Sequence, residues 1–228
     1  MADAIRLRSV VALSGRFPVL AGADLTVSDG QVVLLRGANG AGKTSLLRVC
    51  AGLLGVTSGE ASVLGHDLTA GTGPRRAIRR LVGLLGHDTF LYDDLTVREN
   101  VRFSVRAAGH SVRAADAALD ELGLGGRLAD LTAAKLSAGQ RRRAALAVVV
   151  ARRPRLWLLD EPHAGLDASG RALVDGIVAQ AASAGAAVVI ASHERGQVED
   201  LAARTVEVGG GRTQDVARPP GREPVLVG

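Results

Sequence analysis

The chain has 228 residues, 47% of them hydrophobic and 22% charged, and a formal net charge of +5, a composition typical of a globular protein with one substantial core. This composition excludes a wholly disordered chain and a repeat array. The longest apolar stretch, residues 144–151, is much shorter than the roughly 20 residues that cross a bilayer, and the first residues lack the apolar region of a signal peptide, so we expect a cytoplasmic protein.

Two short runs within the first thirty residues, 5–11 and 19–27, alternate between apolar and polar side chains. Turn-forming residues follow each run, Ser14-Gly15-Arg16 after the first and Ser28-Asp29-Gly30 after the second. Alternation with a period of two between such turns predicts antiparallel strands. We therefore expect an antiparallel β subdomain at the N-terminus.

Residues 36–45 have the spacing of a phosphate-binding loop, Gly-x-x-x-x-Gly-Lys-Thr, between a strand-like apolar run (31–35) and a helix-like run (45–51). Glycines at these positions let successive N–H groups point into one concavity that holds a polyphosphate. The N-terminus of the following helix also favours anions. The predicted nucleotide-binding residues are Gly37, Ala38, Asn39, Gly40, Ala41, Gly42, Lys43, Thr44 and Ser45.

Lys43 is the residue of this loop with the most distinctive chemistry. It is a lysine in a chain whose basic residues are arginines, apart from Lys43 itself and Lys135. We expect its ammonium group to reach the β and γ phosphates of a nucleotide, and the Thr44 hydroxyl to bind Mg²⁺. The alternative, a glycine-rich turn without a ligand, leaves the full spacing of the motif unexplained.

The pattern between about residues 96 and 152 is helical, because apolar residues recur at intervals of three and four in 97–103, 112–122 and 138–151. We expect an inserted α-helical subdomain here. The runs 156–159 and 187–191 are continuously apolar and of strand length, which is typical of parallel strands covered on both faces. The fold is therefore expected to be α/β.

Two carboxylates, Asp160 and Glu161, directly follow the first of these buried strands. In nucleotide hydrolases such a pair divides the work: Asp160 would bind Mg²⁺, and Glu161 would act as the general base that activates water. An acidic turn after a core strand is the alternative for an isolated Asp-Glu pair. The upstream phosphate loop favours the catalytic interpretation.

Residues 136–140, Leu-Ser-Ala-Gly-Gln, predict a helix start at which Ser137 is the N-cap and the next N–H groups face an anion. Alone, they indicate no more than a good N-cap. Together with the phosphate loop, the strand 156–161, the segment 164–167 (Ala-Gly-Leu-Asp) and Ser192-His193, they resemble the motifs of ATP-binding cassette (ABC) ATPases. The resemblance covers about residues 5–210, with Ala138 in place of a usual glycine.

The resemblance implies a fold and a domain organisation. The fold is that of a P-loop NTPase with a RecA-like core sheet, an N-terminal antiparallel β subdomain and an inserted α-helical subdomain at about 96–152. The ABC ATPase domain would span 1–212. The remainder, 213–228, contains three prolines and would be a disordered tail.

The resemblance also implies a site shared by two copies of the chain, which together hydrolyse ATP with Mg²⁺. Residues 137–140, the family's signature, would in one copy contact the γ-phosphate of ATP bound by the other copy. His193, beside the base Glu161, would stabilise the transition state. His87 occupies the position where most family members carry a glutamine that senses Mg²⁺ and the transmembrane partner. The signature residues are Ser137, Ala138, Gly139 and Gln140.

The implied function is that of an ATP-binding and hydrolysing subunit that powers a separate integral membrane permease from the cytoplasmic face of the cell membrane. His87, residues 95–103 and the arginines after Gln140 are similar to the ATP-binding subunit of haem exporters in cytochrome c maturation. An exporter of drugs or antibiotics, or a soluble ABC ATPase outside transport, are the alternatives.

No nucleic acid partner is expected. Arginines cluster at 75–80 and 141–143, but such clusters are typical of solvated helix faces, and aromatic residues make up only 2% of the chain.

Several further side chains are expected to have structural roles. Phe17 is the ring nearest the position of the family's adenine platform, and packing under the sheet is favoured over stacking on adenine. Trp157 and Cys50 are expected in the core. The three histidines without ligand spacing are expected in loops or at the surface: His66, His110 and His163.

Overall fold

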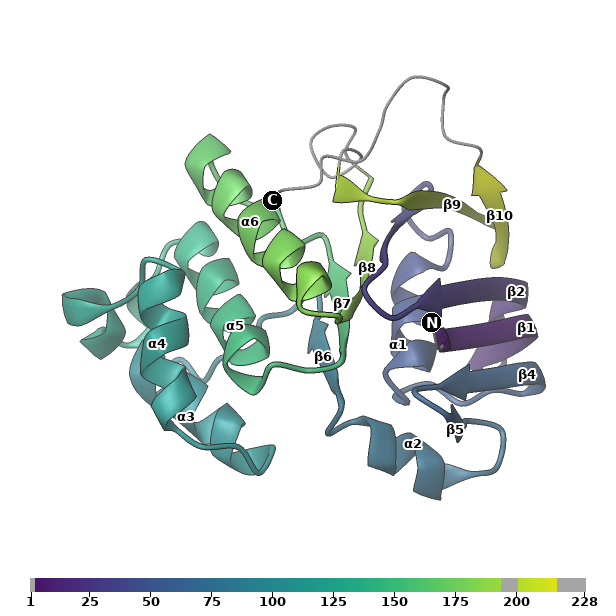
Figure 1. The fold of residues 1–228 in the computed structure, drawn as a ribbon, viewed down its shortest axis with the longest axis horizontal. Helices are drawn as coiled ribbons and strands as arrows, with labels where there is room; N and C mark the ends of the chain where they lie inside the picture. Colours follow the sequence, from purple (N-terminus) through teal and green to yellow (C-terminus); the bar gives the residue numbers. More distant parts are fainter. Residues whose placement is uncertain (1–2, 194–200, 217–228) are drawn as a thin grey trace.

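The computed structural model describes residues 3–193 and 201–216, which form two β-sheets flanked by helices (Figure 1). No helix in this described part is long and apolar enough to span a membrane. In chain order the elements are β1 (Asp3–Ser14), β2 (Phe17–Ser28), β3 (Val32–Arg36), α1 (Lys43–Cys50), β4 (Ser58–Val63), β5 (His66–Asp67), α2 (Thr72–Ile78), β6 (Val82–Leu85), α3 (Val97–Ala107), α4 (Arg113–Glu121), the 3₁₀ helices η1 (Gly126–Asp130) and η2 (Ala133–Lys135), α5 (Ala138–Arg152), β7 (Leu156–Asp160), α6 (Ala168–Ser183), β8 (Ala187–Ala191), β9 (Arg204–Gly209) and β10 (Arg212–Val216).

The larger sheet has six strands in the order β10-β9-β3-β8-β7-β6. All of them pair in parallel except β10, which is the antiparallel partner of β9 at one edge. The apolar runs 156–159 and 187–191 lie in β7 and β8, in which every residue is buried. The prediction of parallel strands covered on both faces is confirmed.

Alternate residues of these strands enter two separate cores, one on each face of the sheet. Val32 and Leu34 of β3 pack with residues of the helices α3 to α6, whereas Val33 and Leu35 pack with α1 and the N-terminal strands. This division follows from the period of two with which side chains leave a strand. The sheet is therefore the layer that joins the helices to the β subdomain.

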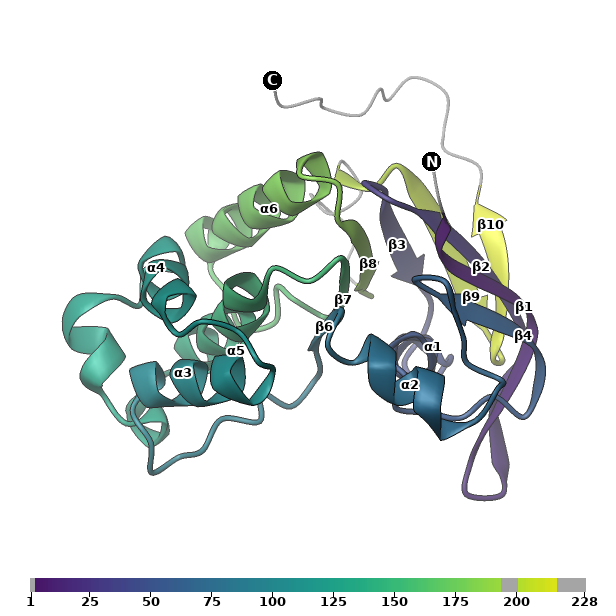
Figure 2. The same cartoon turned by 60° about the horizontal axis from the view of Figure 1, so that its bottom comes forward.

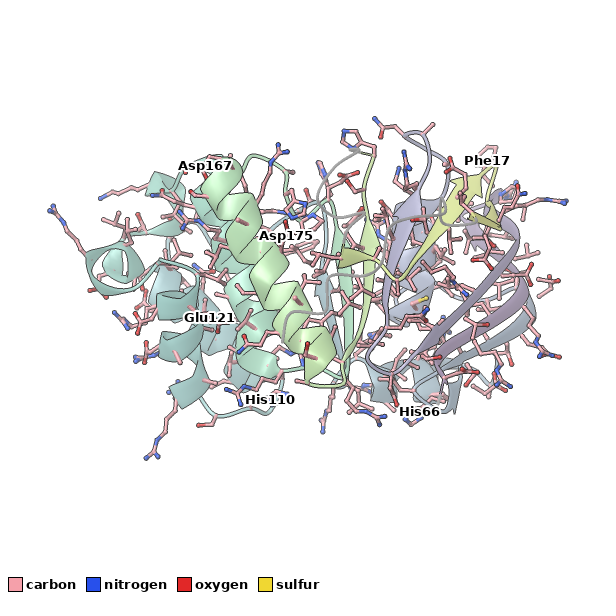
Figure 3. All side chains as sticks on the ribbon, turned by 45° about the horizontal axis from the view of Figure 1, so that its top comes forward. Phe17, His66, His110, Glu121, Asp167 and Asp175 are labelled. Carbon is pink, nitrogen blue, oxygen red and sulfur yellow. The ribbon has the colours of Figure 1, made fainter. Side chains whose placement is uncertain are left out.

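The smaller sheet is antiparallel, with the order β2-β1-β4-β5, which confirms the predicted N-terminal β subdomain. In Figure 2 it lies on the opposite side of β3 from α3, α4 and α5. Phe17 begins β2 at the hairpin turn and is 77% exposed (Figure 3). The expectation that its ring packs under the sheet is therefore wrong, because the turn carries the ring outside both cores.

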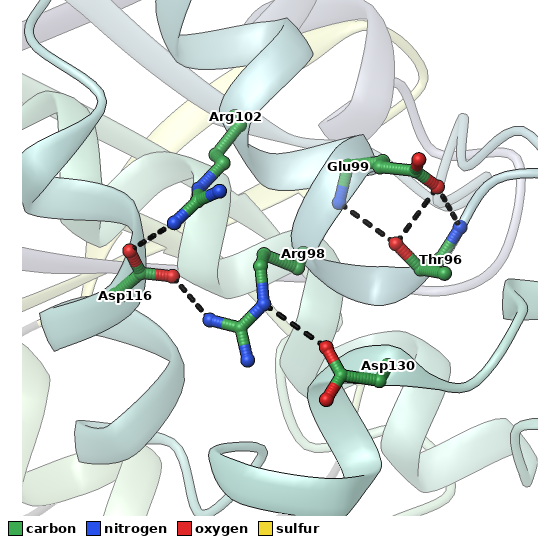
Figure 4. A network of polar contacts seen from close by, with 6 residues as sticks. All are labelled: Thr96, Arg98, Glu99, Arg102, Asp116 and Asp130. Atoms are coloured by element: carbon green, nitrogen blue, oxygen red, sulfur yellow. Dashed lines mark hydrogen bonds and ion pairs between the residues drawn. The ribbon is translucent and has the colours of Figure 1, made fainter.

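The segment 97–152 holds α3, α4, the two 3₁₀ helices and α5. A capping box starts α3: the Thr96 hydroxyl accepts the Glu99 N–H, and the Glu99 carboxylate accepts the Thr96 N–H. Asp116 of α4 accepts hydrogen bonds from Arg98 (2.5 Å) and Arg102 (2.6 Å) of α3 (Figure 4). This carboxylate ties two helices of the segment together.

The expected boundary of the disordered tail at residue 213 is wrong for its first four residues. Residues 213–216 belong to β10, which pairs with β9 along five residue pairs. The backbone hydrogen bonds of a hairpin hold this segment, although its sequence is polar. The rest of the predicted tail, 217–228, lies outside the described residues.

We predict that Asp116→Asn destabilises the protein in a pH-dependent way. Hydrogen bonds from Arg102, and next from Arg98, lower the pKa of the Asp116 carboxyl below its ordinary value. A lowered folded-state pKa stabilises the fold above the unfolded pKa, about 4, and this contribution is lost as the pH falls through the folded-state pKa. Urea unfolding should show a lower free energy of unfolding for the variant at pH 7 and a smaller difference from wild type in acid.

Asp120→Asn, on the same helix but without contacts to Arg98 or Arg102, is the control. An equal destabilisation by Asp116→Asn at both pH values would contradict the role of the ionised carboxylate.

Candidate active site

The predicted phosphate loop and the predicted carboxylate pair meet at one edge of the parallel sheet. The loop follows β3, the carboxylates end β7, and β8 lies between these two strands. Open α/β sheets bind their ligands at this carboxyl-terminal edge. A cavity of about 570 Å³ lies there, lined by residues 39–45 together with Pro18, Val19, His87, Asp160, Glu161, Gly210 and Gly211.

Two glycines let the loop pass close to neighbouring strands. A Cβ atom at Gly37 would lie 2.1 Å from the carbonyl oxygen of Val208, and one at Gly42 would lie 2.9 Å from that of Val19. Gly42 is also the N-cap residue of α1, in the left-handed conformation with φ of 113°. Glycine adopts this conformation without the steric cost of a side chain. The chain can therefore turn directly from the loop into the helix.

The ammonium group of Lys43 lies within the loop. Its Nζ atom donates to the carbonyl oxygens of Gly37 (2.7 Å) and Ala38 (3.2 Å), and the residue is 7% exposed. A lysine ammonium carries three donors on a flexible stem. It can therefore exchange these carbonyl contacts for phosphate oxygens in the adjoining cavity.

Thr44 and Asp160 are 116 positions apart in sequence but are hydrogen-bonded in the structure. The Thr44 Oγ1 atom donates to Asp160 Oδ2 over 2.6 Å, and Asp160 is 4% exposed. A hydroxyl and a carboxylate oxygen are the donor types that Mg²⁺ prefers, and Mg²⁺ takes few protein ligands beside substrate phosphates. Within residues 3–193 and 201–216 no group of three His, Cys, Asp or Glu side chains could hold a metal ion. This donor pair therefore fits Mg²⁺ better than a metal that needs a full protein shell.

The carboxylate of Glu161 is held against β8. Its Oε1 atom accepts the His193 backbone N–H (3.0 Å) and lies 2.7 Å from His193 Nδ1, and its Oε2 atom accepts the Ser192 hydroxyl (3.2 Å). The backbone of Glu161 has φ of 50°, in the left-handed region. That conformation costs a residue other than glycine roughly 1–3 kcal/mol. The surrounding contacts offset this strain and fix the direction of the side chain.

The signature residues 137–140 lie at the start of α5, away from this cavity. Ser137 is the N-cap, and its hydroxyl accepts the Gln140 N–H while the Gln140 side chain accepts the Ser137 N–H. The Gln140 N–H is therefore not free to face an anion, contrary to expectation. A Cβ atom at Gly139 would lie 2.8 Å from the carbonyl oxygen of Gly165, so the signature packs on the segment 164–167 of the same chain.

His87 lies between two cavities. It lines the large cavity beside the phosphate loop and also a small one, about 60 Å³, together with Leu53, Asp88 and Phe90. Phe90 is 79% exposed, and the exposed rings of Tyr92 and Phe103 lie edge to face with centroids 5.4 Å apart. His87 thus borders both cavities, as Thr44 and Asp160 also do.

Sequence reasoning missed two contributions to the site. Pro18 and Val19 of β2, with Gly210 and Gly211 of the β9–β10 turn, line the cavity although their sequence carries no motif. Arg142 was assigned to a solvated helix face, but it is 5% exposed and donates to four backbone carbonyls. The three consecutive arginines concealed which one points inward.

His163 lies in the turn between β7 and α6, as expected of a loop residue, but its side chain is buried. It is 6% exposed, and its Nε2 atom lies 2.8 Å from the carboxylate of Asp175 on α6.

Trp157 and Cys50 are buried as expected, and burial raises the pKa of the Cys50 thiol to about 12. A thiol with so high a pKa is not a nucleophile at neutral pH.

Comparisons with known proteins show the family of the chain. Residues 20–164 match the sequence profile of the ABC transporter family. The cytochrome c biogenesis ATP-binding export protein CcmA of Bordetella bronchiseptica is 43% identical over 85% of this chain and 84% of its own length. CcmA of Rhodopseudomonas palustris is 39% identical over 89% and 96%, respectively.

The fold has close counterparts among solved structures. The dimeric ATP-binding cassette MJ0796, in a post-hydrolysis state bound to ADP and Pi, superposes with a TM-score of 0.85 at 22% identity over 94% of this chain and 100% of that one. The chain therefore belongs to the ABC transporter family, as an ATP-binding protein that hydrolyses ATP. The predicted P-loop NTPase fold is confirmed.

We predict that Lys43→Ala weakens nucleotide binding itself. Removing the ammonium group leaves phosphate oxygens without a charge-assisted hydrogen bond, and hydrogen bonds to charged groups contribute about 1.5–3 kcal/mol. The affinity for ATP, measured by isothermal titration calorimetry, should fall about 10- to 100-fold. Lys135→Ala, at the chain's other lysine, which is exposed, is the control and should bind like wild type. Equal affinity of Lys43→Ala and wild type would exclude the predicted phosphate contact.

Proposed function

We propose that this chain is the ATP-binding and hydrolysing subunit of an exporter that acts in cytochrome c biogenesis, with haem as the cargo that its sequence resemblance implies. The observation that carries the proposal is the similarity to CcmA proteins over nearly their whole length. The subunit works as a peripheral protein on the cytoplasmic face of the cell membrane and acts on a separate integral membrane permease.

The phosphate loop binds the triphosphate of ATP through its N–H groups and through Lys43. The Thr44 hydroxyl and the Asp160 carboxylate would hold Mg²⁺, and their mutual hydrogen bond supports this pairing. When bound, Mg²⁺ supplies positive charge against the phosphate oxygens. The aromatic ring of Phe17 is exposed beside Pro18 and Val19 of the cavity lining and is available to the adenine base.

Glu161 acts as the general base. Its carboxylate accepts hydrogen bonds from Ser192 and His193, which orient it at the cavity. It takes a proton from the attacking water while His193, in contact with the same oxygen, steadies the charge that develops at the phosphate.

Two copies of the chain complete each site. Residues 137–140 do not line the cavity that their own chain forms, although all four are in the described part. In this proposal Ser137, Ala138, Gly139 and Gln140 act on nucleotide bound by the second copy, as the family resemblance implies. The α5 N-terminus, whose first N–H groups have no intrahelical partner, offers them to the γ-phosphate there.

The permease docks on the apolar surface beside His87. Leu53 and Phe90, which line the small cavity with His87, and Tyr92 and Phe103, whose rings lie edge to face, are all at least half exposed. His87 lines the nucleotide cavity and also the small cavity formed by Leu53 and Phe90. A permease segment bound there can therefore sense whether the nucleotide site is filled.

We predict that Glu161→Gln abolishes turnover but preserves ATP binding. The amide keeps the shape of the side chain and cannot accept a proton, and loss of a general base lowers the rate about 10²- to 10⁴-fold. Steady-state phosphate release should fall accordingly, and size-exclusion chromatography with light scattering should show a dimer in ATP. The double variant Lys43→Ala/Glu161→Gln is the control and should remain a monomer.

Full ATPase activity of Glu161→Gln would exclude this residue as the base. A Glu161→Gln protein that stays monomeric in saturating ATP would contradict the shared site.

The identity of the membrane partner tests the cargo. Tagged chain purified from detergent-solubilised membranes should carry an integral membrane protein together with cytochrome c assembly proteins, identified by mass spectrometry. Phe90→Asp should lose this partner, because it places a charge in the apolar docking surface. Leu13→Asp, on the β1–β2 hairpin, should retain it. A permease of a drug efflux system in place of the assembly proteins would remove the biogenesis role and leave the ATPase intact.

A further inference from the structure

One buried arginine joins three segments of the candidate active site. Arg142 lies in the second turn of α5, and its guanidinium group donates to four backbone carbonyls. Its Nη1 atom donates to Gly86 (2.6 Å) and His87 (3.3 Å) at the end of β6. Its Nη2 atom donates to Glu161 (2.9 Å) and to Asp160 at the end of β7.

These carbonyls belong to segments with different roles. The Gly86-His87 segment adjoins the apolar surface, and the Asp160-Glu161 turn carries the metal-binding and basic carboxylates of the proposed mechanism. The helix that carries Arg142 begins with the signature residues that act on the other nucleotide. One side chain therefore links the two nucleotide sites and the surface beside His87.

The chemistry of the contact requires arginine. A guanidinium group is planar and holds five donors in a rigid fork, so that it can bridge two strands, whereas a lysine ammonium is a compact point charge. Within the described residues the Nε atom of Arg142 has no hydrogen-bond partner, and burial lowers the pKa of the group against the opposing effect of the Asp160 and Glu161 charges. The four carbonyl contacts offset the free-energy cost of the unpartnered Nε atom and of burying the guanidinium charge.

The backbone strain at Glu161 gives these contacts a functional meaning. Arg142 binds the carbonyls immediately before and at this residue, which has the left-handed φ of 50°. Without these contacts the turn can relax toward ordinary backbone angles. The carboxylate would then move away from the position in which Ser192 and His193 hold it.

We propose that Arg142 is a positioning residue for ATP hydrolysis, which fixes the Glu161 turn and the His87 segment against α5. It touches no substrate and acts through the backbone. The proposal rests on the function proposed above in one respect, the assignment of Glu161 as the base. It assigns to Arg142 the coupling between the helical segment and the chemistry.

A second arginine on the same helix provides a matched control. Arg152 is half-buried, its Nε atom also has no partner in the described part, and its Nη2 atom donates to the carbonyls of Arg79 (2.9 Å) and Val82 (3.2 Å). It thus binds β6 at the end opposite the nucleotide cavity. Arg142→Lys and Arg152→Lys each retain the charge and lose a guanidinium fork, but only the first change lies at the site.

The test measures kcat and KM for ATP, the affinity and stoichiometry of nucleotide binding, and thermal unfolding for both variants. Arg142→Lys should lower kcat per binding site about 10- to 100-fold, because the Glu161 carboxylate would be misplaced. The affinity of this variant for ATP should be unchanged. Arg152→Lys should lose thermal stability to a similar extent and keep the kcat of wild type. If Arg142→Lys gives no folded protein, Arg142→Gln, which buries no charge, is measured in the same way with the same expectation.

Two results would overturn the proposal: a wild-type kcat for the Arg142 variant, or an equal loss of kcat in Arg152→Lys. Glu161→Gln is assayed in parallel to separate the two hypotheses. Full activity of Glu161→Gln means that the base is wrongly assigned. An inactive Glu161→Gln with a fully active Arg142→Lys means that the positioning role alone fails.

Discussion

The parallel pairing of β3, β8 and β7 is the constraint on which the site depends. Parallel strands end at the same edge, so the phosphate loop after β3, His193 after β8 and the carboxylates of β7 are brought together there. The hydrogen bond between Thr44 and Asp160 and the contact between Glu161 and His193 both result from this register. A shift of one residue in either pairing would turn a side chain of the candidate site to the other face of the sheet.

The parallel sheet has a separate hydrophobic core on each face. One core contains the N-terminal strands and α1, the helix that follows the phosphate loop. The other core contains the helices α3 to α6. Because the strands contribute alternate residues to both cores, neither half can shift without disturbing the sheet between them. The left-handed backbone at Glu161 is tolerated in this rigid setting, where hydrogen bonds surround it.

Buried polar groups, more than apolar packing, set the detailed geometry of the edge. Lys43, Asp160 and Arg142 are each less than a tenth exposed, and each is hydrogen-bonded to a segment distant in sequence or to the loop itself. A buried polar group that loses its partner costs more than a solvent-exposed one, because its desolvation is no longer compensated. The site therefore adopts one arrangement of backbone and side chains.

The sequence by itself determined the phosphate loop, the order of the motifs, the two central buried strands and the antiparallel N-terminal runs. These features depend on local spacing: glycine positions, a period of two, or a continuous apolar run. Only the tertiary structure decided that Arg142 and His163 are buried, that Phe17 is exposed and that residues 213–216 form a strand. The burial of Arg142 depends on carbonyls of distant segments, which leave no pattern in the local sequence, and residues 213–216 form a strand because β9 accepts them as a partner although their sequence is polar.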